Sequence, residues 1–290
     1  MDGDRVAVEI WIDQNISSVI DENTLMAARS FRWRHGQVRV HVHSQHVGIY
    51  GQWMATWRPR NATTTEMALL LEDDLTISRY TYRWLRAARR FYADRQDLAG
   101  FTLQSEGLIR ATGGSFTPPP ATTGAAYLYA LIGSWGFTPL PDVWIGFQDW
   151  YASIMASDRP RLRPIVPGLV MSSWYSMFES QKKADTMWTM WFIYYCSQVR
   201  SQLYTVFNNI HTIAAAVTPK IDDRYICVNR REPGLHFGNA AQKPQKLLRI
   251  WRPEFAQFSR NPPVFNYGGV QINQPPTPVV FLSTVAARAG

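Results

Sequence analysis

Three consecutive acidic residues, Glu72, Asp73 and Asp74, form the densest group of chemically capable side chains in this 290-residue sequence. They follow directly on an apolar run, residues 67–71, which predicts a buried parallel strand whose carboxyl end carries the acids. Ligands of open α/β sheets bind at that edge. Because neighbouring carboxylates repel one another unless a cation compensates their charge, the triplet predicts a site for a divalent metal ion and phosphate groups.

A structural role for the same acids competes with this interpretation. Acidic residues after a strand can begin the next helix, where they cap free backbone N–H groups and complement the helix dipole. Ser78 suits that role better, because a strongly amphipathic run extends from it to Asp94. The acids lie several residues upstream of Ser78, which favours the metal interpretation.

Strand and helix patterns alternate through the first hundred residues, and this order predicts an α/β fold with a parallel sheet. The expected strands cover residues 6–13, 38–42, 67–71 and 98–104, and the expected helices cover residues 21–34, 48–57 and 78–94.

The remainder of the chain is less regular. Residues 110–124, rich in Gly and Pro, predict a long loop of the kind that often forms a mobile flap. Helices are expected at residues 142–155 and 184–206. We expect a Pro- and Asn-rich tail after Trp251 to pack loosely or to be disordered. The chain therefore divides into an α/β half (1–110), a second half of the same domain (111–250) and a tail (251–290).

Composition narrows the classes of function. With 46% hydrophobic residues the chain can bury a large core. The net charge of +8 suits an anionic ligand, but the basic residues form no compact block, which argues against nucleic-acid binding. No apolar run approaches the roughly 18 residues that span a bilayer, and no secretory signal pattern is present. Cys196 and Cys227 fit either one disulfide or two buried thiols.

Four features together resemble a nucleotide-diphospho-sugar transferase of the GT-A type. They are the α/β start, the acidic triplet, the segment from Ser134 to Gly136 and the segment from Gly234 to His236. The similarity is closest to family-2-like glycosyltransferases and more distant to the N-acetylglucosaminyltransferases of N-glycan processing, and it covers about residues 6–240. It implies a Rossmann-type, mostly parallel sheet flanked by helices, lacking the first strand and helix of the family.

The resemblance also implies a role for each acid. Asp74 would bind Mn²⁺ or Mg²⁺ at the donor diphosphate, Asp73 would contact the donor ribose or a water on the metal, and Glu72 would contact the nucleotide. Asp13, at the end of the first strand, would lie near the uridine or ribose. His236 would complete the metal shell, although a solitary histidine is more often a structural hydrogen-bonding group than a metal ligand.

An inverting transferase needs a carboxylate that takes the proton of the acceptor hydroxyl. Asp149 is the first choice because it follows the segment that resembles the acceptor-side loop, and Glu179 and Asp185 are alternatives.

Among the tryptophans, Trp135 is expected to stack on a sugar ring, whereas Trp188 and Trp191 are expected in the core. Residues 1–110 would then bind the donor, and residues 111–250 the acceptor.

The sequence thus predicts a metal-dependent, inverting glycosyltransferase that moves a sugar from a nucleotide donor, UDP-sugar by resemblance, to the hydroxyl of a glycan acceptor. A membrane would be involved only through an anchor preceding the present N-terminus, which would place the protein in the Golgi; without one, it would be cytoplasmic. The first alternative is a catalytically inactive relative that binds nucleotide sugar or glycan. A basic nucleic-acid-binding protein is the remote alternative.

Overall fold

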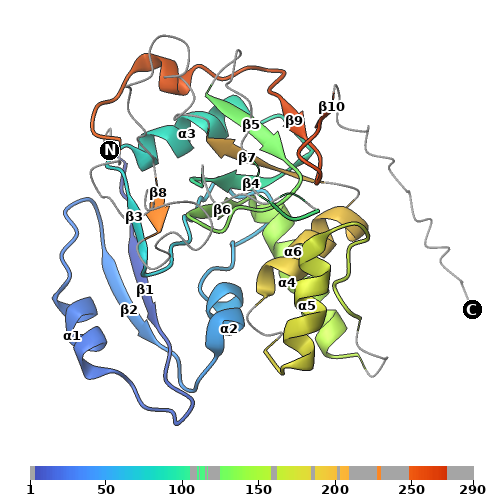
Figure 1. Ribbon diagram of the computed structural model, residues 1–290. Coiled ribbons are helices and arrows are strands. Elements are labelled where there is room, and N and C mark those ends of the chain that lie inside the picture. Colours follow the sequence, from blue (N-terminus) through green and yellow to red (C-terminus); the bar gives the residue numbers. More distant parts are fainter. Residues whose placement is uncertain are drawn as a thin grey trace, which may run out of the picture.

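The computed structural model describes residues 4–104, 110, 112–114, 116, 125–157, 162–183, 187–200, 203–208, 227–229 and 248–272. Within these ranges the protein is mixed α/β, and its largest sheet has six strands with helices on both faces (Figure 1). Two smaller sheets, of two strands each, complete the strand content of these ranges.

The N-terminal unit is a β–α–β arrangement of β1 (Val8–Ile12), α1 (Glu22–Ser30) and β2 (Val38–Val42), as the sequence predicted. The two strands are parallel, with Val8 opposite Val38. Alternation places the aliphatic side chains of both strands against α1, in a small cluster that includes Ile12 and Leu25. Helix α1 begins where the Asp21 carboxylate accepts a hydrogen bond from the backbone N–H of Thr24, at 2.7 Å.

The six-stranded sheet is assembled from distant parts of the chain. Its order is β10 (Gln271–Ile272), β9 (Val264–Phe265), β5 (Ala126–Tyr129), β7 (Tyr204–Asn208), β4 (Leu98–Thr102) and β6 (Phe137–Pro139). The β4–β7 and β5–β9 pairs are parallel, and the other three pairs are antiparallel. The expected mostly parallel sheet is therefore wrong, because β6 runs opposite to β4, β5 runs opposite to β7 and β10 runs opposite to β9.

Helices cover the two faces of this sheet. On one face, Trp84 and Leu85 of α3 (Thr81–Phe91) pack against Leu128 and Val206. On the other face the aromatic side chains of β5 and β7 meet the C-terminal helices. These helices are α5 (Val170–Ser180) and α6 (Trp188–Tyr194), while α2 (Gly48–Ala55) and α4 (Pro141–Met155) pack with α6 in an adjoining aromatic cluster.

The expected strand at residues 67–71 is wrong. This segment makes a single antiparallel bridge, between Leu70 and Phe137 of β6, and Leu71 is 45% exposed. The strand in this region is β3 (Leu75–Ile77), after the acids, and it pairs antiparallel with β8 (Cys227–Asn229). An apolar run indicates that a segment tends to be buried. Whether the segment forms a strand also depends on a neighbouring strand with which it can pair, and the run itself does not specify that strand.

Two further expectations need correction. The helix expected at residues 184–206 consists of α6 and the π-helical turn η2 (Tyr195–Val199), and the chain then becomes β7. Short buried strands and buried helices look alike in sequence, since both are continuous apolar runs. The tail after Trp251 is not loosely packed as far as residue 272, because the 3₁₀ helix η5 (Pro253–Ala256) and β9 bury Phe255 and Phe265.

Cys196, in η2, is a buried free thiol whose pKa is raised by burial, and the side chain of Cys227 lies outside the described part. The predicted loop at residues 110–124 also falls largely outside it.

Candidate functional site

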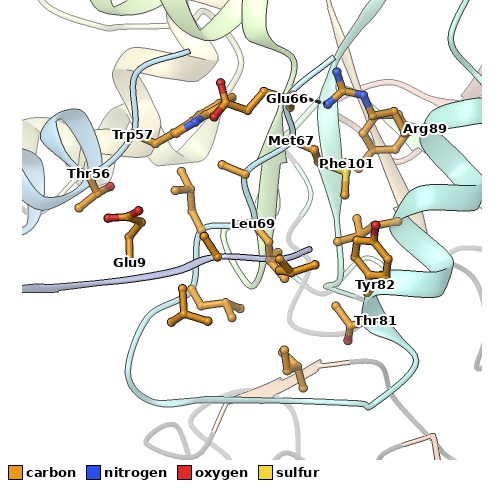
Figure 2. A pocket seen from close by; sticks show the side chains of 18 of the residues that line it. Glu9, Thr56, Trp57, Glu66, Met67, Leu69, Thr81, Tyr82, Arg89 and Phe101 are labelled. Carbon is orange, nitrogen blue, oxygen red and sulfur yellow. Dashed lines mark hydrogen bonds between the residues drawn. The ribbon is translucent and has the colours of Figure 1, made fainter. Parts of the chain in front are cut away.

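A cleft of about 2780 Å³ separates the N-terminal unit from the rest of the protein. Its walls are β1, the end of α2, the segment from residue 62 to residue 74, and α3. Figure 2 shows Glu9 on one side and Tyr82 and Arg89 of α3 on the other, with Met67 and Leu69 between them. Most small-molecule pockets measure roughly 300–1,000 Å³, so this cleft has room for a ligand of several linked parts.

The acidic triplet lies on the wall of this cleft, in the turn between residue 71 and β3. The turn is closed by a hydrogen bond from the N–H of Leu75 to the C=O of Glu72, at 3.2 Å. Asp73 is exposed, whereas Glu72 and Asp74 are half-buried. The sequence placed the acids at the rim of an α/β sheet, at the carboxyl end of a strand; in the structure a turn before β3 presents them on the cleft wall.

The first acid is held by an aromatic side chain of α2. The indole N–H of Trp53 donates to Oε1 of Glu72, at 3.3 Å. Trp53 is itself buried and stacks on Trp188, with the ring centroids 4.0 Å apart. Since Trp188 belongs to the core, this contact fixes one carboxylate of the triplet relative to the main body.

The triplet by itself does not form a complete metal site. In the described ranges, no three His, Cys, Asp or Glu side chains are close enough together to hold a metal ion. Mg²⁺ is commonly bound through one or two carboxylates, with the remaining positions filled by substrate phosphates and water. Asp73 and Asp74 are chemically suited to such a cation, which takes one or two carboxylates from the protein and its other ligands from phosphates and water.

Asp13 lies at the carboxyl end of β1, where the sequence placed it, and also lines the cleft. Its Oδ1 accepts hydrogen bonds from the N–H groups of Gln14 and Val47, and its Oδ2 accepts one from Gly48 at 2.8 Å. Nδ1 of His46 lies 3.0 Å from Oδ2. Burial acts to raise the pKa of Asp13, but the three backbone hydrogen bonds and His46 outweigh it and lower the pKa. Asp13 is therefore an ionised cap at the start of α2.

Glu9 and Trp11 also line the cleft, and the sequence reasoning missed them. Glu9 forms an ion pair with Arg39 and a hydrogen bond with the ring of His41, and the Trp11 ring stacks on His41 with the centroids 4.3 Å apart. Alternation places residues 9, 11 and 13 on the face of β1 away from α1, but residues of both faces line the cleft, so the sequence pattern alone did not point to them.

A basic side chain fixes the segment that leads to the triplet. Arg89 of α3 is half-buried, and it donates to the backbone C=O of Glu66 at 2.9 Å (Figure 2). Burial lowers the pKa of Arg89 from its ordinary value. From the sequence, Arg89 was counted only among scattered basic residues of a mostly solvated surface, so its role was missed.

The structure describes two of the candidates for the catalytic base, Asp149 and Glu179, and neither lines the cleft. Asp149 of α4 is 61% exposed and pairs with Arg58 at 2.7 Å. Glu179 of α5 pairs with Arg163 at 2.6 Å on the surface. The structure thus brings Asp13 and the triplet to one cleft, and places Asp149 and Glu179 elsewhere.

The remaining predicted residues have mixed outcomes. Trp188 and Trp191 are core residues, as predicted. Trp135 is only 8% exposed and packs in the main core, so the expected open face for a sugar is wrong. Asp185 and His236 lie outside the described residues.

Among the helices that the structure describes, none combines the length and apolar character needed to cross a membrane. Neither a scan against protein-family models nor a search of curated proteins gave a match to this chain.

Proposed function

We propose that this protein is a metal-dependent glycosyltransferase of the GT-A type, which transfers a sugar from a nucleotide-diphosphate donor to a glycan hydroxyl with inversion. The observation that carries the proposal is the acidic triplet on the wall of a large cleft, opposite a parallel β–α–β unit. Neither feature alone is specific, but nucleotides bind at the carboxyl ends of such parallel strands.

The proposed donor spans the two walls. Asp13, at the carboxyl end of β1, marks the nucleoside side of the cleft, and Asp73 and Asp74 mark the diphosphate side. A bound Mn²⁺ or Mg²⁺ would neutralise charge on the departing nucleoside diphosphate. Glu72, restrained by Trp53, would orient the turn that presents the other two acids.

The pairing of β3 with β8 supports a role for the late histidine. Asn229, the last residue of β8, lies opposite Leu75, directly after the acidic triplet. His236 follows Asn229 by seven residues, a length of chain that spans at most about 25 Å. His236 as a metal ligand is thus compatible with the position of β8, and it stays a prediction.

The identity of the base also stays a prediction. Asp149 and Glu179 are tied to arginines on the surface, so either would have to exchange its partner for the acceptor hydroxyl. Asp185 lies outside the described residues, and all three are candidates for substitution to the amide.

The test is a thermal-shift screen of UDP-, GDP- and CMP-sugars with and without Mn²⁺, on the parent protein, Asp74→Asn and Asp94→Asn. Asp94 is an exposed acid outside the cleft, and its substitution matches the charge change. A ligand at 100 times its Kd stabilises the folded state by about 2.7 kcal/mol. We expect one donor to stabilise the parent and Asp94→Asn only with Mn²⁺, and Asp74→Asn not at all.

Two results would count against the proposal. Equal stabilisation of Asp74→Asn and the parent would remove the acidic triplet from the site. Stabilisation without any transfer to glycan acceptors would instead support the catalytically inactive relative.

A further inference from the structure

The segment that joins α1 to β2 alternates aromatic and basic side chains. Along the sequence, the rings of Phe31, Trp33 and His35 alternate with Arg32 and Arg34. Phe31 is 42% exposed, and both arginines are exposed. A surface hollow of about 470 Å³ is lined by the last four of these residues, and this volume lies within the usual range of small-ligand sites, roughly 300–1,000 Å³. The segment therefore presents aromatic rings and positive charge at one place on the surface.

Contacts with the chain just before β1 hold this segment in place. The indole N–H of Trp33 donates to the C=O of Val6 at 2.6 Å, and the N–H of Val6 donates to the C=O of His35 at 3.0 Å. A Cβ added at Gly36 would lie 2.3 Å from the same oxygen of Val6, so a glycine is needed where the two stretches of backbone meet. The Trp33 ring thus has a fixed position on the N-terminal unit.

The two arginines are oriented by local contacts that leave donors open. Nη1 of Arg32 donates to the C=O groups of Arg29 and Phe31, both at 3.0 Å, and Nε of Arg34 donates to Nε2 of His35, also at 3.0 Å. Among the residues that the structure describes, Nε and Nη2 of Arg32 and both Nη atoms of Arg34 have no hydrogen-bond partner. Each guanidinium therefore keeps two adjacent donors, which is the arrangement that binds an oxyanion through two parallel hydrogen bonds.

More positive charge surrounds the segment. Arg29, in the last turn of α1, and Arg5, before β1, are exposed and form no ion pair within the described ranges. Residues 23–65 contain no acidic residue. The nearby acids Asp4 and Glu9 form ion pairs with arginines of α3 and β2. The charge of the segment is thus available to an anionic ligand.

The segment also borders the cleft, at the end away from Asp13. Its cleft-lining residues are Phe31, Trp33, Arg34 and His35. Trp33 is bonded to Val6, and the seven residues from there to Asp13 cover about 23 Å when extended. A ligand on the segment would therefore not overlap a nucleotide beside Asp13.

We propose that residues 31–35 bind an acidic polysaccharide, with the aromatic rings against its sugars and the arginines on its carboxylate or sulfate groups. In such a polymer the apolar C–H faces of the sugar rings alternate with anionic groups, as rings alternate with guanidinium groups in this segment. A nucleic-acid strand would instead require a long positive groove with several stacking rings. That the bound glycan is the acceptor rests on the proposed function, whereas the binding itself does not.

The test measures the binding of a fluorescent heparin hexasaccharide by anisotropy, without donor or metal, at about 0.15 M ionic strength. Arg32→Gln with Arg34→Gln removes the open donors. Arg252→Gln with Arg260→Gln is the matched control, because it makes the same change of charge at exposed positions outside the cleft and the hollow. We expect the first variant to weaken binding about tenfold and the control to weaken it less than about twofold.

A further variant tests the aromatic part of the proposal. Phe31→Ala keeps every charge and changes an exposed side chain, and it should weaken binding about threefold. Unchanged binding by this variant would contradict the contact between the segment and sugar rings.

Three results would overturn the proposal as a whole. One is equal weakening by the two double variants, which would mean that the overall charge of the protein binds the polymer. Another is unchanged binding after Arg32→Gln with Arg34→Gln. The third is tighter binding of a single-stranded oligonucleotide of the same charge. Asp74→Asn should bind the hexasaccharide like the parent, so failure here and failure of the donor screen are distinguishable.

Discussion

The six-stranded sheet buries both faces, whereas the two-stranded sheet of β1 and β2 buries only one. Every residue of β4 and β5 is buried, but in β1 only Ile12 is. The main sheet is surrounded by three large clusters of buried side chains, while the N-terminal unit has one small cluster of three buried residues. The candidate site lies where these two unequal parts meet, so its geometry depends on the less stable of them.

The largest expected effect on stability comes from a pair of substitutions that compares the main sheet with the N-terminal unit. Phe207→Ala, in the middle of the main sheet, should lower the free energy of unfolding by about 3–5 kcal/mol, because it leaves a cavity among fully buried rings. Leu25→Ala, in the small cluster, should cost about 2 kcal/mol, at the low end for such substitutions, since its surroundings can collapse. Urea unfolding followed by circular dichroism measures both, and equal costs would contradict the comparison.

A smaller effect is expected at the start of α2. Asp13→Ala removes the side-chain acceptor for Val47 and Gly48, and loss of such a cap costs about 1–2 kcal/mol.

This cost should depend on pH. The pKa of Asp13 in the folded protein lies below its ordinary value of 3.8, so the ionised cap stabilises the protein above that pH. The stabilisation is lost as the pH falls through the lowered value. Thermal unfolding of parent and variant between pH 7 and pH 2 should show the difference narrowing only below about 3.8. A constant difference would mean that Asp13 acts without its charge.

The smallest effect on stability is expected for Asp149→Asn. Asp149 and Arg58 are both more than half exposed, and exposed ion pairs contribute about 0–1 kcal/mol. If Asp149 is the base, however, transfer should fall by about 10²–10⁴-fold with little change in melting temperature. Unchanged transfer by this variant would remove Asp149 from the candidates and leave Glu179 and Asp185.

Local patterns predicted several elements well. Alternation identified β1 and β2, and the amphipathic repeat with Trp84 and Ala88 on one face identified α3. In each case the apolar side chains that define the pattern are also the ones that pack against neighbouring elements, so the local sequence is enough to predict the strand or helix.

Elements that depend on distant partners were mispredicted. Residues 67–71 and 203–208 are both short apolar runs, yet the first makes a single bridge and the second becomes the central strand β7. The difference lies in the partners that each run meets, and these are supplied by residues far away in sequence.

For the site, carboxylate chemistry identified Glu72, Asp73 and Asp74, and position at a strand end identified Asp13. Trp53 and Arg89 went unnoticed, because their contacts with Glu72 and with the backbone of Glu66 exist only in the folded chain.

The central place of β7 has a consequence for the order in which the molecule can form. Strands β4 and β5 are both hydrogen-bonded to β7 and not to each other, although they precede it by about a hundred and about eighty residues. During synthesis, the edges of β4 and β5 that pair with β7 therefore stay unpaired until residue 208 has been added. The other edge of β5 stays unpaired until β9 has been added. Such long-range pairing slows folding and leaves apolar strands exposed in the meantime. The nascent chain thus passes most of its synthesis with an incomplete sheet, and this interval is when it most needs protection from aggregation.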